Sequence, residues 1–246
     1  MADFHRKTCY VLARIKNQTA REGYNNEGMG SCIIRMRSGS RFWRCSGGRF
    51  WLCAPACCAA VAVIFCQMMH FFEHEIPKLL PNPWVRAAAG GAAVVALSYL
   101  MGVGRYNGAG MDVIVDAVEL GQALPWDFVC KMVLTVLTLS VGFKGGEVVP
   151  SFYIGATFGC VVGPLLGLPA GFSAAVGLVC VFCGATNTLV ASIVLGAELF
   201  SGAGFELIAL ACGLSYMFSG YHSLYSSQGF RTSKLFSEFL QPKEGK

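Results

Sequence analysis

Hydrophobic residues occur along this chain in long runs that are separated by short polar or glycine-rich breaks. The first run begins at Leu52, becomes polar after Met69 and ends at Pro81-Asn82-Pro83. We expect one long helix from Leu52 to about Leu80, because the run is long enough to cross a bilayer and proline ends a helix. A second run, from Trp84 to Met101, is rich in Ala and Gly, which is typical of membrane helices that pack closely.

The next segments alternate in the same way. Residues Gly102 to Gly121 are too polar to span a membrane, and they predict a loop with a short interfacial helix. Trp126 to Val141 predicts a further span, although it contains Lys131. A lysine at such a position either extends its ammonium group to the interface or faces the protein interior.

A glycine-rich turn leads into the following helix. Gly145-Gly146-Glu147-Val148-Val149-Pro150 predicts a flexible bend that continues as a helix from Pro150 to Leu166, because proline favours the first helical position. In that helix Gly155, Gly159 and Gly163 recur every four residues, so one face allows another backbone to approach closely. The first amides of a helix lack partners within it and lie at the positive end of its dipole. This bend is therefore a candidate anion-binding site.

The remaining apolar segments are short. Phe172 to Cys183 and Leu189 to Phe200 are separated by Gly184–Thr188, and each reaches about 20 Å, less than a hydrocarbon core of about 30 Å. Such interrupted segments are typical of discontinuous helices that meet at an ion site in the middle of the membrane. Phe205 to Gly220 predicts another span. We expect an all-α polytopic membrane protein with discontinuous and short re-entrant helices.

Composition agrees with a membrane setting, because 54% of residues are hydrophobic, 13% are charged and the mean hydropathy is +0.54. Residues 1–50 contain ten Lys and Arg against three Asp and Glu, without helical or strand periodicity. We interpret them as a poorly structured, positively charged cytoplasmic flank rather than a nucleic-acid site. The expected organisation is this segment, a membrane domain over residues 51–230 and a polar tail over residues 231–246, in a multi-pass protein of the cell membrane.

The motifs resemble the carboxy-terminal half of the CLC chloride channel and transporter family. The resemblance rests on the Gly-Gly-x-x-x-Pro turn, the Gly155-Ala156-x-x-Gly159 pattern, the segment from Val190-Ala191-Ser192 to Glu198, and Tyr225, with Lys131 and Thr135 ahead of the turn. Phe143-Lys144-Gly145-Gly146-Glu147-Val148 is most similar to the bacterial fluoride/proton antiporter branch. That branch often has threonine and phenylalanine where this chain has Val149 and Tyr153.

The resemblance implies transport of a small inorganic anion, chloride or fluoride. The anion-binding residues would be Gly145, Gly146, Glu147, Val148 and Tyr225, with the amides of Glu147 and Val148 on one side and the Tyr225 hydroxyl on the other. Glu147 is also the candidate for proton coupling, because a carboxylate within a bilayer readily becomes neutral. A role in capping or hydrogen bonding near the turn is the structural alternative.

The family builds its pathway from two inverted halves, and the Gly-x-Glu-Gly-Pro turn of the first half is not visible in this chain. Arg21-Glu22-Gly23 resembles it only superficially, since no proline or apolar helix follows. We therefore expect half of a CLC-type inverted-repeat fold, with a missing amino-terminal half or a second copy of the chain as partner. An inactive membrane fragment is the alternative.

Other chemistry is less well supported by its context. His70-Phe71-Phe72-Glu73-His74 matches the His-x-x-Glu-His pattern of some zinc proteases, so a membrane zinc hydrolase using His70, Glu73 and His74 is a further alternative. The motif lies where a helix leaves the lipid, a usual place for such residues. Most of the twelve cysteines lie in apolar segments, where they pack as small hydrophobic residues. We expect no disulfide, cofactor, resident metal or enzymatic activity.

Overall fold

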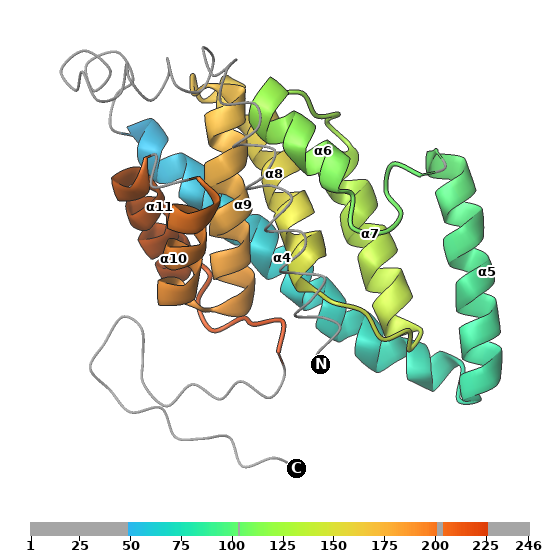
Figure 1. Cartoon of the computed structure of the whole chain (residues 1–246). Coiled ribbons are helices and arrows are strands. Elements are labelled where there is room, and N and C mark those ends of the chain that lie inside the picture. Colours follow the sequence, from blue (N-terminus) through green and yellow to red (C-terminus); the bar gives the residue numbers. More distant parts are fainter. Residues whose placement is uncertain (1–48, 103, 201–203, 226–246) are drawn as a thin grey trace, which may run out of the picture.

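The computed structural model describes residues 49–102, 104–200 and 204–225. These residues form helices joined by loops, without a β-strand among them (Figure 1). The helices, with the labels of Figure 1, are α4 (Arg49–Leu79), α5 (Pro83–Met101), α6 (Met111–Val115), the short π-helix η1 (Asp116–Leu120), α7 (Asp127–Ser140), α8 (Val148–Leu165), α9 (Ala170–Thr186), α10 (Leu189–Leu199) and α11 (Phe205–Phe218). The described part of the chain confirms the all-α prediction. The expectation for residues 1–50, including Arg21-Glu22-Gly23, and for residues 231–246 falls almost wholly outside it.

Helix α4 slants across the molecule and contacts α7, α8, α9 and α11 (Figure 1). It is one continuous helix of 31 residues, as predicted, even though Pro55 and Pro77 lie within it. Its buried face carries Ala62, Phe65 and Cys66, which are fully enclosed. Asn82 precedes α5, whose first residue is Pro83, a position where the missing N–H is not needed.

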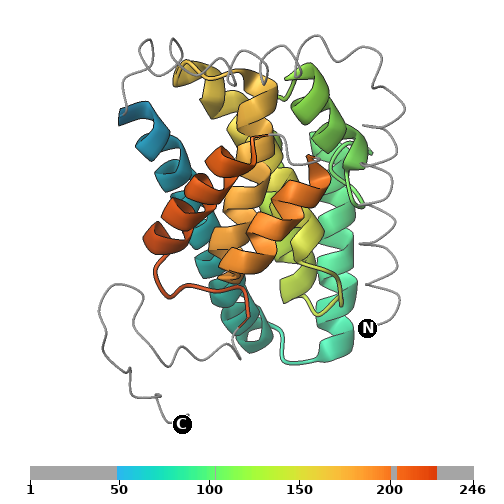
Figure 2. The ribbon, with the colours of Figure 1, turned by 60° about the vertical axis from the view of Figure 1, so that its left-hand side comes forward.

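The centre of the fold is the pair α8 and α9, which lie side by side in Figures 1 and 2. A Cβ atom on Gly155 would lie 2.5 Å from the Gly177 carbonyl oxygen, and one on Gly159 would lie 2.2 Å from that of Ser173. Real side chains do not approach backbone atoms so closely, so only glycine fits these positions. The predicted glycine face of α8 is thus the surface on which α9 packs.

Helices α10 and α11 complete one side of the core. They pack against each other and against α9, and α11 also packs against α4. The Ser215 hydroxyl donates to the Cys180 carbonyl oxygen over 2.8 Å, which joins α11 to α9. Because α9 is surrounded by these neighbours and by α8, nearly all of its residues are buried.

Helix α5 stands apart on the opposite side of the molecule, as Figure 1 shows. It packs mainly on α7, and only Gly90 and Ser98 are buried. Two polar contacts hold its ends: Arg86 Nε donates to the Val141 carbonyl oxygen over 3.1 Å, and Ser98 Oγ donates to Asn107 Oδ1 over 2.9 Å. The broad apolar surface of α5 is otherwise exposed within the described chain.

Several boundaries differ from the sequence prediction. Helix α9 continues through Gly184–Thr186, which were expected to break it, because this end of the helix is buried against α4 and α11 and terminates only at Asn187 with φ of 55°. Pro150 is the third residue of α8 rather than the first. Helices α7 and α11 have 14 residues each and reach about 21 Å, so they are shorter than the spans expected from their runs.

Among the described residues, three helices are long and apolar enough to cross a membrane, over residues 53–79, 83–101 and 148–165. The apolar helices α9, α10 and α11 are shorter. Together these helices define a membrane protein. Helices long enough to cross a membrane are thus combined with apolar helices that are too short to do so.

Candidate anion-binding site

The predicted anion site lies at the amino-terminal end of α8. Glu147 precedes the helix with helical backbone angles, φ −92° and ψ −19°, and its side chain does not cap the helix. The first helical hydrogen bond joins the Ser151 amide to the Glu147 carbonyl oxygen over 3.2 Å. Pro150 has no N–H, so the helix offers the amides of Val148 and Val149 as donors that it does not use itself.

The turn before α8 has its positive-φ glycine ahead of the Gly145-Gly146 pair. Its left-handed residue is Gly142, with φ of +107°, whereas Gly145 and Gly146 have no positive φ among the described residues. The reversal of the chain therefore occurs at the end of α7, beside the Arg86 guanidinium. Gly145 and Gly146 instead line a cavity, and a Cβ atom on Gly145 would lie 3.2 Å from Leu139 Cδ2.

The Glu147 carboxyl is only partly exposed, and its Oε2 atom is fully buried. That oxygen has no hydrogen-bond partner among the residues that the structure describes. Glu73 and His70, both on α4, lie close enough to act on this carboxyl electrostatically. A buried carboxyl oxygen without a donor is costly in its charged form, so the site favours either a proton or a donor that arrives with a ligand.

Tyr225 lies beyond the end of α11 and is half-exposed. Burial of part of the ring raises the pKa of the Tyr225 phenol above its ordinary value, and the negative charge of Glu147 raises it further. The phenol therefore retains its proton and remains a hydrogen-bond donor. The same interaction shows that the fold brings Tyr225 and Glu147 into one electrostatic neighbourhood.

A cavity of about 480 Å³ lies beside the turn. Its lining includes Gly145, Gly146, Val149 and Pro150 from the turn and α8, and Lys131 and Thr135 from α7. Val94 of α5 and residues 106–109 close its other side. The predicted anion-binding glycines thus face an open space that is lined by both apolar and polar groups.

Lys131 faces the protein interior, which decides between the two alternatives that the sequence left open. Its side chain is 3% exposed, and its Nζ donates to the carbonyl oxygens of Tyr106 and Gly108 over 2.8 and 2.6 Å. The ammonium group also lies 5.1 Å from the centre of the Tyr153 ring, a cation–π distance. Lys131 therefore secures the loop that borders the cavity.

A second polar cluster supports the same loop. The Arg105 guanidinium donates to both carboxylate oxygens of Asp127, at 3.2 and 2.7 Å, and the Tyr106 hydroxyl donates to Asp127 over 2.8 Å. The amide of Leu124 donates to the same carboxylate over 3.0 Å. Asp127 is fully buried, so these donors replace the water that a carboxylate would otherwise bind.

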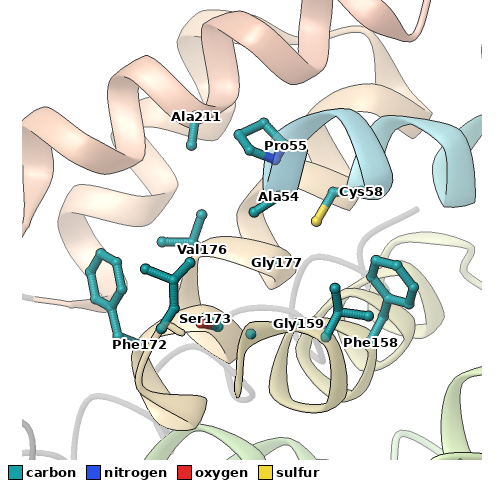
Figure 3. Close-up of a pocket in the computed structure, with 13 residues that line it drawn as sticks. Ala54, Pro55, Cys58, Phe158, Gly159, Phe172, Ser173, Val176, Gly177 and Ala211 are labelled. Carbon is teal, nitrogen blue, oxygen red and sulfur yellow. The ribbon is translucent and has the colours of Figure 1, made fainter. Parts of the chain in front are cut away.

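Figure 3 shows a different and much smaller pocket, of about 30 Å³, between α4, α8, α9 and α11. Its lining is apolar apart from Ser173, and it includes Cys58, Phe158, Phe172 and Val176. None of the predicted anion-binding residues borders it. We interpret it as a packing gap beside the crossing of α8 and α9.

The residues of the zinc-hydrolase alternative do not form a ligand cluster. No three side chains of His, Cys, Asp or Glu gather in a metal-binding arrangement within the described ranges. His70 instead contacts the Ser223 carbonyl oxygen through its Nε2 atom at 2.7 Å. Cys180 and Cys183 are buried among the packed residues of α9, and the Cys183 thiol donates to the Cys212 carbonyl oxygen over 3.6 Å.

Sequence reasoning missed the cavity, the Asp127 cluster and the contact of His70 with residues near Tyr225. The Arg105 and Asp127 pair gave a weak signal, because two opposite charges flank a glycine-rich stretch between apolar runs. The His70 contact gave none, since its partner lies 153 residues further along the chain.

The fold defines a class, an all-α membrane protein with both long and short apolar helices, and its candidate site lies at the amino-terminal end of α8. A family model described as "Voltage gated chloride channel" matches residues 47–220. The chain belongs to this family, the CLC family. Members of the CLC family are channels and transporters rather than enzymes.

Two relatives show where the similarity lies. The chain is 40% identical over 178 residues to a chloride/fluoride channel protein of Pseudomonas syringae pv. tomato, and the match covers 70% of this chain and 39% of the relative. It also matches the crystal structure of a CLC-type fluoride/proton antiporter with a TM-score of 0.69 and 36% identity, over 72% of this chain and 45% of the other. The chain thus spans less than half the length of these relatives.

Proposed function

We propose that this chain supplies one half of a CLC-type pathway that carries fluoride or chloride across the cell membrane, with Glu147 coupling the movement to protons. The proposal rests on one arrangement. The free amides at the start of α8 and the partnerless carboxyl oxygen of Glu147 occupy the same turn. The first attract an anion and the second binds a proton, so the turn can hold both transported species.

The donors around the proposed site are neutral. Backbone amides and a phenol replace part of the hydration shell of an anion without the strong attraction of a fixed positive charge. Lys131, the nearest candidate cation on the cavity wall, directs its ammonium group to carbonyl oxygens instead. Weak binding by several donors favours release, which transport requires.

Anion binding by the purified chain in detergent tests the proposal. Isothermal titration with sodium fluoride and sodium chloride is expected to show saturable binding of at least one of the two. Binding should strengthen as the pH falls, because protonation of Glu147 removes its repulsion of the anion. Glu147→Gln should bind about tenfold more tightly at neutral pH and lose the pH dependence, since about 1.4 kcal/mol corresponds to a factor of ten.

Tyr225→Phe should weaken the same binding by about tenfold, because one hydrogen bond to a charged group is lost. The matched controls are Glu75→Gln and Tyr99→Phe, which alter an exposed carboxylate on α4 and an exposed phenol on α5. Both should bind like the parent. Absence of binding in the parent would support the alternative of an inactive membrane fragment, and equal affinity in Tyr225→Phe would exclude Tyr225 from the site.

Flux measurements test whether the pathway needs another segment. Liposomes that contain only the purified chain are expected to show no sustained fluoride or chloride efflux, whereas co-reconstitution with the amino-terminal half of a relative should produce it. Robust efflux from the chain alone would refute the half-pathway proposal. The proposed partners are therefore such a half, a second copy of the chain and the lipid bilayer.

A further inference from the structure

The contact between His70 and Ser223 lies next to the proposed anion site and joins α4 to the segment that carries Tyr225. Ser223 precedes Tyr225 by two residues, and its carbonyl oxygen lies 2.7 Å from His70 Nε2. A carbonyl oxygen can only accept a hydrogen bond, so His70 Nε2 carries the hydrogen and donates it. This holds for the neutral Nε2–H tautomer and for the imidazolium ion, because both have that N–H.

The two polar atoms of a single peptide group are fixed by different helices. The carbonyl oxygen of the Ser223–Leu224 peptide accepts from His70 on α4, and its N–H donates to the Ala185 carbonyl oxygen on α9 over 2.9 Å. A peptide group is planar, so two bonds from opposite edges determine its orientation. Tyr225 is the residue that directly follows Leu224, so its backbone continues from this peptide group.

Other contacts hold the surrounding backbone but not this peptide plane. The Asn187 side chain donates to the His222 carbonyl oxygen, and the Tyr225 amide donates to Ser223 Oγ over 3.2 Å. Leu224 is buried, which anchors the residue between them. Among these described contacts, the hydrogen bond from His70 is the one that comes from α4. It therefore links the position of Tyr225 to that of α4.

We propose that His70 is a positioning residue, which orients the Tyr225 hydroxyl toward the anion held at the start of α8. The inference rests on the proposed function, because it assigns His70 to the same site. It explains why a histidine lies at the point where α4 becomes polar. It also assigns His70 a role as a donor to the backbone, distinct from the metal ligand that the His-x-x-Glu-His pattern indicated.

Three substitutions at one position test the donor role. His70→Ala and His70→Phe remove the N–H, and the second keeps the volume of the ring. Both should weaken fluoride or chloride binding by about fivefold in isothermal titration. His70→Gln places an amide N–H near the position of Nε2 and should restore the affinity to within twofold of the parent. His74→Ala, an exposed histidine one turn further along α4, is the matched control and should not change binding.

A double substitution tests whether His70 acts through Tyr225. His70→Phe combined with Tyr225→Phe should bind no more weakly than Tyr225→Phe alone, because the phenol that His70 orients is already absent. Additive losses, or a His70→Gln variant as weak as His70→Phe, would overturn the inference.

Hydrogen exchange tests the same contact without an anion. The peptide that covers residues 219–225 should exchange faster in His70→Phe than in the parent or in His70→Gln. Unchanged exchange in His70→Phe would overturn the inference alone and leave the proposed function intact. Absence of anion binding in the parent would overturn the proposed function, and this inference with it.

Discussion

Helix α8 and helix α5 are both long and apolar enough to cross a membrane, but they are held in different ways. In the most apolar window of each, 56% of α8 and 6% of α5 is buried within the described chain. Helix α8 touches α9 along a row of glycines, whereas α5 is attached by Arg86, Ser98 and packing on α7. Hydropathy alone does not distinguish these two situations.

The difference shows what each helix contributes to the site. Contact of α8 with α9 at Gly155, Gly159 and Gly163 fixes the helix whose first turn carries the candidate anion-binding amides. Val94 of α5 and the loop residues 106–109 form the far wall of the cavity, and hydrogen bonds of Arg86 and Ser98 hold the ends of α5. The turn from Gly142 to Glu147 joins the two regions. The cavity therefore has one rigid side and one side that depends on individual hydrogen bonds, while Glu147, Val148 and Tyr225 are not part of its lining.

Among the substitutions that test this comparison, Gly159→Val should cause the largest loss of stability. The added Cβ would lie 2.2 Å from the Ser173 carbonyl oxygen and 2.9 Å from its carbon, and neither backbone atom can move without separating the helices. We expect a loss of at least about 3 kcal/mol in stability. Thermal unfolding in detergent, followed by size-exclusion chromatography, measures it.

Gly91→Ala on α5 is the control for that substitution. Its Cβ would meet Phe143 Cζ at 3.6 Å, an ordinary contact, and alanine stabilises a helix by about 0.5 kcal/mol relative to glycine. A Gly159→Val chain as stable as the parent would contradict the close contact of α8 with α9.

Asp127→Ala should have the next largest effect, because it leaves Arg105, the Tyr106 hydroxyl and the Leu124 amide without their shared acceptor. We expect a loss of about 3 kcal/mol, the lower end of the range for a broken buried ion pair. The loop should also become accessible to trypsin at Arg105, which mass spectrometry of the fragments detects. Asp116→Ala, at an exposed carboxylate, should change stability by less than about 0.5 kcal/mol. Equal cleavage rates in both variants would count against a supporting role for Asp127.

Arg86→Ala should have the smallest effect, because it removes one hydrogen bond, to the Val141 carbonyl oxygen at the start of the turn. We expect a loss of about 1 kcal/mol. Hydrogen exchange of residues 141–146 should accelerate, while exchange within α8 should stay the same. Lys78→Ala, which removes an exposed ion pair with Glu75, serves as the control. Faster exchange throughout α8 would show that the two regions are not held independently.

The sequence predicted helices best where length and proline decide the outcome. Helices α4 and α5 follow their apolar runs, because Pro81 and Pro83 separate them. It predicted less well where packing decides. Gly184 remains helical in α9, since its surroundings are Ala62 of α4 and Ser215 of α11, which no local pattern indicates.

Only part of the candidate site could be predicted, again because local sequence patterns do not show contacts between distant segments. The donors at the start of α8 depend on neighbouring residues, so the turn could be recognised from its own sequence. The placement of Tyr225 near Glu147 entered through the family resemblance. The orientation of Lys131 and the contact of His70 with Ser223 depend on loops that return from distant parts of the chain, and these required the structure.

The touching backbones of α8 and α9 also limit how such a protein can move. If either helix rolled or slid, the carbonyl groups of Gly177 and Ser173 on α9 would collide with the backbone of α8. The reason is that α8 has only glycines where these carbonyl groups face it. The two helices therefore travel together or remain still. Any conformational change in the described part of the chain is therefore expected around this pair, in side chains or neighbouring segments.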